Sequence, residues 1–266
     1  MQKIISFAAI MEGKITFLGT GTSQGVPMIA CSCRSCCSAD PRDKRLRTSA
    51  LVEFGGKKIV IDAGPDFRQQ ILRVRAWDTD AVILTHNHKD HTGGLDDVRS
   101  FNYFQRRAFP IYSEPYVQES LKGEYPYVFA ELRYPGAPEF ELHTIGPEKS
   151  FSIDSAEIIP VRAWHYKLPV LGFRFGRLGY LTDANRIEES ELEKFKGIDI
   201  FVISTIRRAE HISHFSLEQA LEVARRTGAK RTFLTHISHQ LEPYAELCEA
   251  LPEGVEPAYD GLVIDF

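Results

Sequence analysis

The stretch Ala81-Val-Ile-Leu-Thr-His86-Asn-His88-Lys-Asp90-His91 runs from an apolar segment straight into three histidines and one aspartate. The apolar segment, residues 81–84, is predicted to be a buried strand. His86 and His88 are two positions apart and therefore project to the same side of extended backbone. Imidazole and carboxylate suit zinc, manganese, iron or nickel, and four such groups exceed what one ion with an open position needs. The stretch therefore predicts a centre for two metal ions.

Composition limits the classes of protein that fit. The chain has 266 residues, 43% of them hydrophobic and 26% charged, which is ordinary for a globular protein with a large core. The net charge of −4, without a basic block, indicates no long nucleic-acid footprint. Small anionic substrates still fit, because bound metal ions reverse the local charge.

Neither a membrane span nor a signal peptide is indicated. No apolar run reaches the roughly 18 residues that a membrane span needs, and the apolar part of residues 1–10 is brief and lacks a cleavage site. We therefore expect a cytoplasmic protein, with residues 1–10 as a short disordered lead and residues 11–266 as a single domain. Met1 and Met11 are both candidates for the true start.

The pattern of strands and turns predicts an α/β fold. Hairpins are expected at Gly55-Gly56 and at Gly176-Arg177, and hairpins imply antiparallel pairing. An amphipathic helix is expected over residues 216–227, where Ser216 and Gln219 match a capping box. Two mixed sheets with helices on the outside fit this order better than a purely parallel sheet.

Other expectations concern packing. Phe101, Tyr103 and Phe104 are expected to pack within a helical stretch, and Cys248 is expected to be a buried helix residue. The stretch 115–146 has the weakest pattern, and the role of residues 113–150 is open; a cap over a pocket is one interpretation.

Three later residues can complete the metal centre. His165, Asp183 and His236 each follow a predicted strand, as His86 does, and strand ends that gather at one edge of a sheet commonly carry the chemistry. One ion could be held by His86, His88 and His165, and the other by Asp90, His91 and His236, with Asp183 bridging the two. Two ions about 3.5–4 Å apart can activate water for an in-line displacement.

Two further motifs carry chemistry. His211 and His214 precede the amphipathic helix, where a histidine can stabilise a phosphoryl oxygen or protonate a leaving alkoxide. The cluster Cys31-Ser-Cys33-Arg-Ser-Cys36-Cys37 suits thiolate metal binding better than disulfides. The glycine-rich turn Gly19-Thr-Gly21 lacks the Gly-Lys-Ser/Thr that would make it a phosphate loop.

The motif Thr85-His86-x-His88-x-Asp90-His91, followed by His165, Asp183 and His236, resembles the metallo-β-lactamase superfamily. That resemblance implies a four-layer αββα sandwich with a binuclear site at the edge between the two sheets. It also implies that Asp62 supports the site without binding metal.

Within the superfamily the chain looks most similar to the PhnP-type cyclic phosphodiesterases, neighbours of the tRNase Z nucleases. In PhnP-like proteins three cysteines and a histidine bind a structural zinc ion. The resemblance assigns that role to Cys31, Cys33, Cys36 and His239, and it leaves Cys37 as the spare thiol. Four thiols without a metal are the alternative.

The resemblance also implies a function. We expect a binuclear metal-dependent phosphodiesterase that acts on small or cyclic phosphodiesters through a metal-bridging hydroxide, with zinc or manganese as the active-site metal and nickel or iron as alternatives. Asp90 would bind metal and orient the nucleophile, His214 would stabilise the leaving oxygen, and His211 would contact the site without binding metal. A small phosphodiester is the expected partner, and a homodimer is left open.

Three other functions fit parts of the sequence. A tRNA 3′-processing nuclease shares the core motif, but such enzymes carry an extended, normally basic arm. A thioester hydrolase of the glyoxalase II type shares the metal ligands but not the cysteine cluster. A non-catalytic accessory protein like PqqB shares the cysteine cluster, although such a protein need not keep every active-site ligand.

Overall fold

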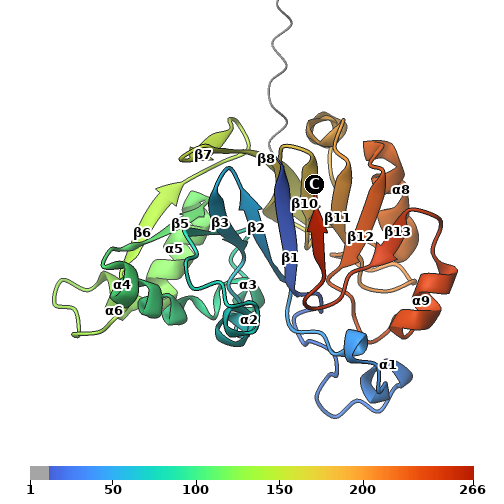
Figure 1. Ribbon diagram of the computed structural model, residues 1–266, viewed down its shortest axis with the longest axis horizontal. Coiled ribbons are helices and arrows are strands. Elements are labelled where there is room, and N and C mark those ends of the chain that lie inside the picture. The colour runs from blue at the N-terminus through green and yellow to red at the C-terminus, as the bar shows by residue number, and fades with distance from the viewer. Residues whose placement is uncertain (1–11) are drawn as a thin grey trace, which may run out of the picture.

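The chain folds into two seven-stranded sheets that pack face to face between two layers of helices (Figure 1). This computed structural model describes residues 12–266, so the lead expected at residues 1–10 lies outside the described residues. The four-layer αββα sandwich expected from the sequence is confirmed. Among the described residues, no helix combines the length and apolarity that crossing a membrane requires.

Both sheets are mixed. The first sheet contains, from edge to edge, β14 (Val263–Asp265), β1 (Gly13–Gly19), β2 (Ser49–Phe54), β3 (Lys57–Ile61), β4 (Ala81–Ile83), β5 (Phe109–Ser113) and β6 (Phe140–Thr144). The second contains β13 (Val255–Pro257), β12 (Arg231–Thr235), β11 (Ile200–Ser204), β10 (Leu178–Leu181), β9 (Leu168–Phe175), β8 (Ala156–His165) and β7 (Phe151–Ile153). The pairs β1–β2, β2–β3 and β9–β10 are antiparallel, whereas the pairs β3–β4, β10–β11 and β11–β12 are parallel.

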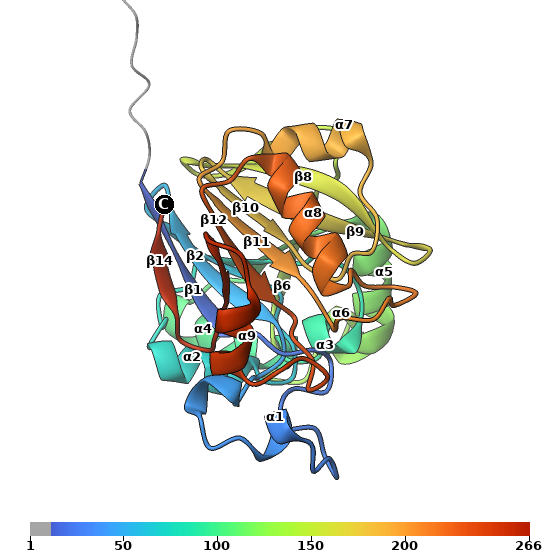
Figure 2. The same ribbon diagram turned by 90° about the vertical axis from the view of Figure 1, so that its right-hand side faces the viewer.

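Helices cover the outer face of each sheet (Figures 1 and 2). The helices between the strands of the first sheet are α2 (Phe67–Val74), α3 (Lys89–Thr92), η2 (Leu95–Val98), α4 (Arg99–Gln105), α5 (Pro115–Glu124) and α6 (Pro126–Phe129). The second is accompanied by α7 (Glu189–Leu192), η3 (Glu193–Phe195), α8 (Leu217–Thr227) and α9 (Tyr244–Ala250). The short α1 (Arg34–Cys37) and η1 (Pro41–Asp43) belong to the cysteine loop, which projects at the bottom of both views.

Strands that are apolar on both faces explain the layering. In β3, Ile59 and Ile61 point into the core between the sheets, whereas Val60 points into the core under the helices. In β11, Val202 and Ile203 divide in the same way. Alternate residues of a strand face opposite sides, so an unbroken β-branched run needs a partner on both faces. Each fully buried side chain of this kind contributes roughly 1.5–3 kcal/mol.

The α8 helix forms as its sequence predicts. The side chain of Ser216 accepts a hydrogen bond from the backbone N–H of Gln219, and the Gln219 side chain accepts one from the backbone N–H of Ser216. The helix ends at Gly228, whose φ of 73° is in the left-handed region that favours glycine. The capping box expected from the sequence is therefore confirmed.

Three expectations about packing are wrong. Tyr103 and Phe104 are 78% and 80% exposed, because the short α4 buries one face and that face carries Phe101. Cys248 is exposed on α9, where Leu247 takes the buried position instead.

The stretch 115–146, which has the weakest sequence pattern, is largely regular structure. It forms α5, α6 and the edge strand β6, which pairs with β5. Val117 and Leu121 of α5 are fully buried in the core under the first sheet, so the stretch completes that layer.

A substitution in the central core tests the sandwich. Phe233 is fully buried between the sheets, with its ring centroid 5.9 Å from that of Phe17. We expect Phe233→Ala to lower the free energy of unfolding by about 3–5 kcal/mol, because it leaves a cavity that neither sheet can fill. The matched control is Tyr103→Ala, which removes an exposed ring and should change stability by less than about 0.5 kcal/mol. Denaturant unfolding measures both, and equal losses would contradict the assignment of the core.

Candidate metal centre

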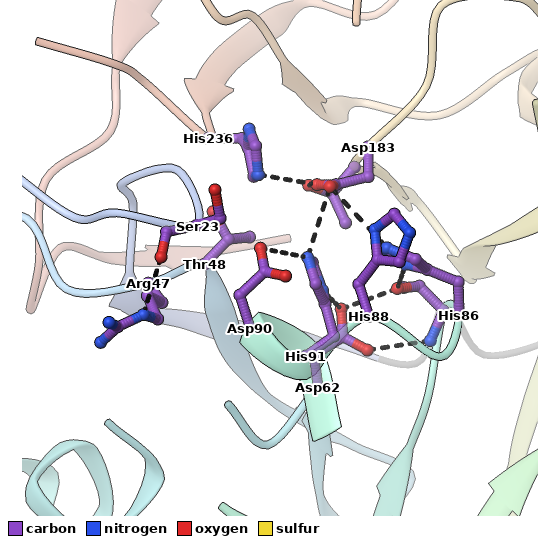
Figure 3. Close-up of polar contacts among 12 residues, drawn as sticks. Ser23, Arg47, Thr48, Asp62, His86, His88, Asp90, His91, Asp183 and His236 are labelled. Atoms are coloured by element: carbon purple, nitrogen blue, oxygen red, sulfur yellow. Dashed lines mark hydrogen bonds and ion pairs between the residues drawn. The ribbon is translucent and has the colours of Figure 1, made fainter. Parts of the chain in front are cut away.

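The seven expected metal ligands gather where strands of the two sheets end. Figure 3 shows the expected ligands other than His165. The motif residues follow β4 of the first sheet, and α3 begins within the motif. The other ligands lie at the ends of three strands of the second sheet: His165 at the end of β8, Asp183 after β10 and His236 after β12. The site is therefore assembled from both sheets, at the edge between them.

Asp183 lies at the centre of this cluster. Its Oδ1 is 3.0 Å from Nε2 of His236, and its Oδ2 is 3.4 Å from Nε2 of His91 and 3.8 Å from Nε2 of His86 (Figure 3). All four side chains are buried. One carboxylate thus faces three imidazoles, which is the arrangement that a bridging ligand needs.

Asp62 holds the motif from behind. Its Oδ2 is 2.6 Å from Nδ1 of His91 and accepts a hydrogen bond from the hydroxyl of Thr85, while its Oδ1 accepts one from the backbone N–H of Thr85. A carboxylate bound to Nδ1 fixes the ring of a histidine and leaves Nε2 free for a metal ion. Asp62 therefore lies where the resemblance expects it, behind His91 rather than among the facing donors.

The electrostatics of the cluster favour positive charge. Although burial opposes protonation of His91, the carboxylates of Asp183, Asp62 and Asp90 raise the pKa of that imidazole well above its usual range. Burial, followed by the charge on His91, lowers the pKa of His86 well below its usual range. Three carboxylates around one imidazole create a negative potential that favours a bound proton. Divalent metal ions would be favoured by the same negative potential.

The donor atoms fit divalent cations. The Nε2 atoms of His86, His91 and His236 are buried and have no hydrogen-bond partner anywhere in residues 12–266. Ligand atoms of Asp90, His91, Asp183 and His236 all lie within 4.8 Å of one another, and so do those of His86, His88 and Asp183. Buried polar atoms rarely stay unpaired, and nitrogen with carboxylate oxygen suits zinc and related ions. The residues therefore fit two cations that share Asp183.

His214 lies beside this cluster, in addition to its place just before α8. It is buried, its ring centroid is 4.5 Å from that of His165 and 4.9 Å from that of His236, and one of its nitrogens lies within 4.8 Å of ligand atoms of His165 and Asp183. His211 lies farther out, with its ring centroid 5.1 Å from that of His214. Burial, followed by the charge on His236, lowers the pKa of His214 to about 3, so its imidazole is neutral.

Strained backbone accompanies these side chains. Asp62, Asp183 and His236 have φ values of 62°, 48° and 55°, in the left-handed region that side chains rarely adopt. Such residues cost about 1–3 kcal/mol each and persist where the surrounding structure imposes them, commonly at functional sites.

The cysteine cluster closes on His239 as expected. The Sγ atoms of Cys31 and Cys33 lie 3.3 Å and 3.4 Å from Nδ1 of His239, and the donor atoms of these residues and Cys36 all lie within 4.8 Å of one another. A hydrogen bond from the backbone of Cys36 lowers the pKa of Cys33 to about 6, whereas burial raises the pKa of Cys36 to about 11. Three thiols and one imidazole at this spacing fit a tetrahedral zinc ion.

This cluster ties an early loop to the loop that carries His236. The hydroxyl of Ser35 donates to the carbonyl of Leu241, and the N–H of Ile237 donates to the carbonyl of Thr20 in the glycine-rich turn. No helix follows that turn: Gly21 makes bridges to Arg47 and to Ile237 instead. The turn therefore positions the loop that carries His236 and does not act as a phosphate loop.

Sequence reasoning missed several residues that position the ligands. The carbonyl of Ser213 accepts a hydrogen bond from Nδ1 of His165. The side chain of Asn185 bonds to the backbone of Tyr166, in the turn after β8, and to the backbone of Ile212, in the loop before α8. Asn185 offered a signal, because it stands two residues after Asp183 at a strand end. Ser213 offered none, since its backbone carbonyl takes part and any residue supplies one.

Comparisons with known proteins agree with this geometry. The model of the Beta-lactamase superfamily domain matches residues 57–237. The crystal structure of a diphosphatase from the PhnP family is 37% identical and superposes with a TM-score of 0.90, covering 96% of this chain and 98% of that one. Coenzyme PQQ synthesis protein B from Cupriavidus taiwanensis is 25% identical in an alignment that covers 94% of this chain and 98% of that protein.

A longer relative also matches. An octanoyltransferase from Porphyromonas gingivalis is 41% identical over 247 residues, which are 92% of this chain and 50% of that protein. The chain thus spans about half the length of this relative. Taken together, the matches place the chain in a known class: it belongs to the beta-lactamase superfamily and, within it, to the PhnP family.

The cysteine cluster can be tested separately from the histidine cluster. We expect Cys33→Ser to remove about one tightly held zinc ion per chain and to leave the histidine cluster's ions in place, because the two sets share no ligand. A loss of about 2–3 kcal/mol would lower the melting temperature by roughly 5–10 °C. Cys37→Ser, which removes the exposed spare thiol, is the matched control. Unchanged zinc content and melting in Cys33→Ser would refute a structural zinc.

Proposed function

We propose that this protein is a metal-dependent hydrolase that cleaves small phosphodiesters, cyclic ones included. The observation that carries the proposal is the convergence of three buried imidazole nitrogens, from His86, His91 and His236, on the carboxylate of Asp183. The PhnP-family neighbour, which is a diphosphatase, supports chemistry at phosphorus.

In the proposed ligand sets, His86, His88 and His165 would hold one ion and Asp90, His91 and His236 the other, with Asp183 shared between them. Two of the groups of facing donors are His86, His88 and Asp183, and Asp90, His91, Asp183 and His236. His165 faces Asp183 and His214, and its ring centroid is 5.1 Å from that of His88. When bound, two divalent ions supply the positive charge that activates water at neutral pH and neutralises phosphate oxygens. Zinc and manganese suit these ligands, and nickel and iron are the alternatives.

The protein's own groups would orient the reactants. Although burial opposes its ionisation, the carboxyl group of Asp90 has a pKa held well below its usual range by His91, so it stays ionised and can accept a hydrogen bond from the attacking water. His214 is neutral and can donate one N–H to an oxygen of the phosphate or of the leaving group. Water adds to phosphorus, the bond to one ester oxygen breaks, and that oxygen leaves as an alcohol with one proton from the water.

A diphosphate linkage is the second candidate, because the neighbour with 37% identity is a diphosphatase. The attack on phosphorus is the same, but the leaving oxygen belongs to a second phosphate. Acyl transfer is not carried over from the octanoyltransferase, since half of that protein lies outside the aligned part.

The tRNA-processing and accessory alternatives have less support. In the described residues, the segment 184–210 forms the compact elements α7, η3 and β11 rather than an extended arm. An accessory protein would need no complete set of facing donors, yet all seven side chains are present in the cluster.

Removing a shared or orienting carboxylate should stop the reaction. We expect Asp183→Ala and Asp90→Ala to lower the rate of hydrolysis of bis(p-nitrophenyl) phosphate by roughly 10³-fold or more. Each variant lacks one proposed metal ligand, and Asp90→Ala also lacks the carboxylate that orients the attacking water. Asp78→Ala, at a side chain 70% exposed and paired with Lys58, is the control and should keep full activity. If the wild-type protein loaded with zinc or manganese hydrolyses neither phosphodiesters nor diphosphates, the proposal fails.

His214 should affect turnover rather than metal content. We expect His214→Ala to retain both ions while kcat falls by about 10²–10⁴-fold, because a positioned hydrogen-bond donor is lost. Metal analysis beside steady-state kinetics separates the two effects. Loss of an ion would instead make His214 a ligand together with His165 and Asp183.

A further inference from the structure

A pocket of about 530 Å³ adjoins the metal-ligand cluster at His88 and His165. Its other walls are residues 166–168, at the turn between β8 and β9, and residues 212–213, in the loop before α8. Small-molecule sites have volumes of about 300–1,000 Å³, so this pocket can take a group much larger than a single phosphate. Of its walls, the proposed chemistry uses His88 and His165 and not the rest.

The pocket walls are held together by the side chain of Asn185, and also by the hydrogen bond between Nδ1 of His165 and the carbonyl of Ser213. Oδ1 of Asn185 accepts a hydrogen bond from the backbone N–H of Tyr166 at 2.8 Å, and its Nδ2 donates one to the carbonyl of Ile212 at 2.9 Å. Tyr166 has a φ of 56°, a left-handed conformation that a tyrosine adopts at a cost of about 1–3 kcal/mol. Asn185 follows Asp183 by two residues, so the pocket and the metal centre are positioned by the same strand end.

Apart from the imidazoles of His88 and His165 and the hydroxyl of Ser213, the side chains that line the pocket are apolar or aromatic with one cation. Tyr166 and Ile212 are large side chains that remain 51% and 69% exposed, and Nζ of Lys167 lies 5.3 Å from the centre of the Tyr166 ring. None of the lining residues carries a carboxylate or a side-chain amide, and the amide of Asn185 is occupied by the two walls. The ring, the apolar side chain and the ammonium together suit a flat aromatic group that carries negative charge nearby.

We propose that this pocket binds the base of a nucleotide whose phosphodiester lies at the metal-ligand cluster. Tyr166 and Ile212 are the specificity-determining residues, since a base can lie on the ring and against the apolar side chain. Asn185 is a positioning residue that holds both walls. The inference deepens the proposed function and rests on it.

The test compares two substrates that differ in the base alone. Adenosine 2′,3′-cyclic phosphate and methyl riboside 2,3-cyclic phosphate carry the same cyclic phosphodiester on the same sugar. With the zinc- or manganese-loaded protein, we expect kcat/KM to favour the adenosine compound by roughly 10- to 100-fold, as base stacking allows. Tyr166→Ala should abolish that preference, mainly through KM, whereas Tyr166→Phe should keep it because the ring remains.

Matched variants separate recognition from structure. Tyr103→Ala removes an exposed ring elsewhere and should leave the preference unchanged. Asn185→Ala should reduce the preference while metal content stays the same. Asn102→Ala is its control, since Asn102 also joins two backbone segments, residues 107 and 139, far from the pocket, and should have no effect on the preference.

A binding experiment gives a readout that does not depend on turnover. In saturation-transfer NMR with the zinc-loaded protein, the base protons of adenosine 5′-monophosphate should receive saturation in the wild type and Tyr166→Phe but not in Tyr166→Ala. The inference is overturned if the wild type shows neither preference nor base saturation, even when it hydrolyses bis(p-nitrophenyl) phosphate. If no phosphodiester is hydrolysed, the proposed function fails, and base saturation alone decides the pocket.

Discussion

The contact of the Asp183 carboxylate with His91 and His236 is the interaction on which the site depends, because it joins side chains from both sheets. His91 comes from the loop after β4 of the first sheet, and Asp183 and His236 follow β10 and β12 of the second. These side chains meet when the two sheets pack face to face over their shared core. The sandwich therefore acts as the frame that brings distant segments of the chain to one cluster of donors.

The same frame sustains backbone strain at the site. Asp62, Asp183 and His236 are all left-handed, and left-handed residues with side chains persist where their surroundings impose them. Three contacts hold Asp62 in place. Its carboxylate is bound by Thr85 and by His91, and its backbone carbonyl accepts a hydrogen bond from the hydroxyl of Ser49. Parallel strands that are buried on both faces give such positions little freedom to relax.

A second anchor acts from outside the sandwich. The cysteine cluster gathers around His239, which is three residues after His236. Ile237, which lies between these two histidines in the chain, donates its backbone N–H to the glycine-rich turn. The loop that carries the candidate ligand His236 is thus held at both ends, by β12 and by the cysteine cluster. The cysteine cluster therefore has a structural role of its own, which is to hold the loop that carries His236.

Much of the architecture and most of the candidate site could be predicted from the sequence. Hairpins at Gly55-Gly56 and Gly176-Arg177, and the capped helix that begins after Ser216, follow from local rules that need no knowledge of the fold. The motif from His86 to His91 indicated its chemistry because its residues are neighbours in the chain. The exposure of Tyr103, Phe104 and Cys248 could not be predicted, because a short helix packs on whichever face its neighbours offer.

By itself the sequence determined the types of ligand, the strands that carry them and the family they belong to. Tertiary structure alone decided which ligands face one another, that His214 lies beside His165, and that Asn185 joins the walls of a pocket. The physical reason is that hydrogen-bond and helix-capping rules act over a few residues. Distances between His91, Asp183 and His236, in contrast, depend on how two whole sheets pack.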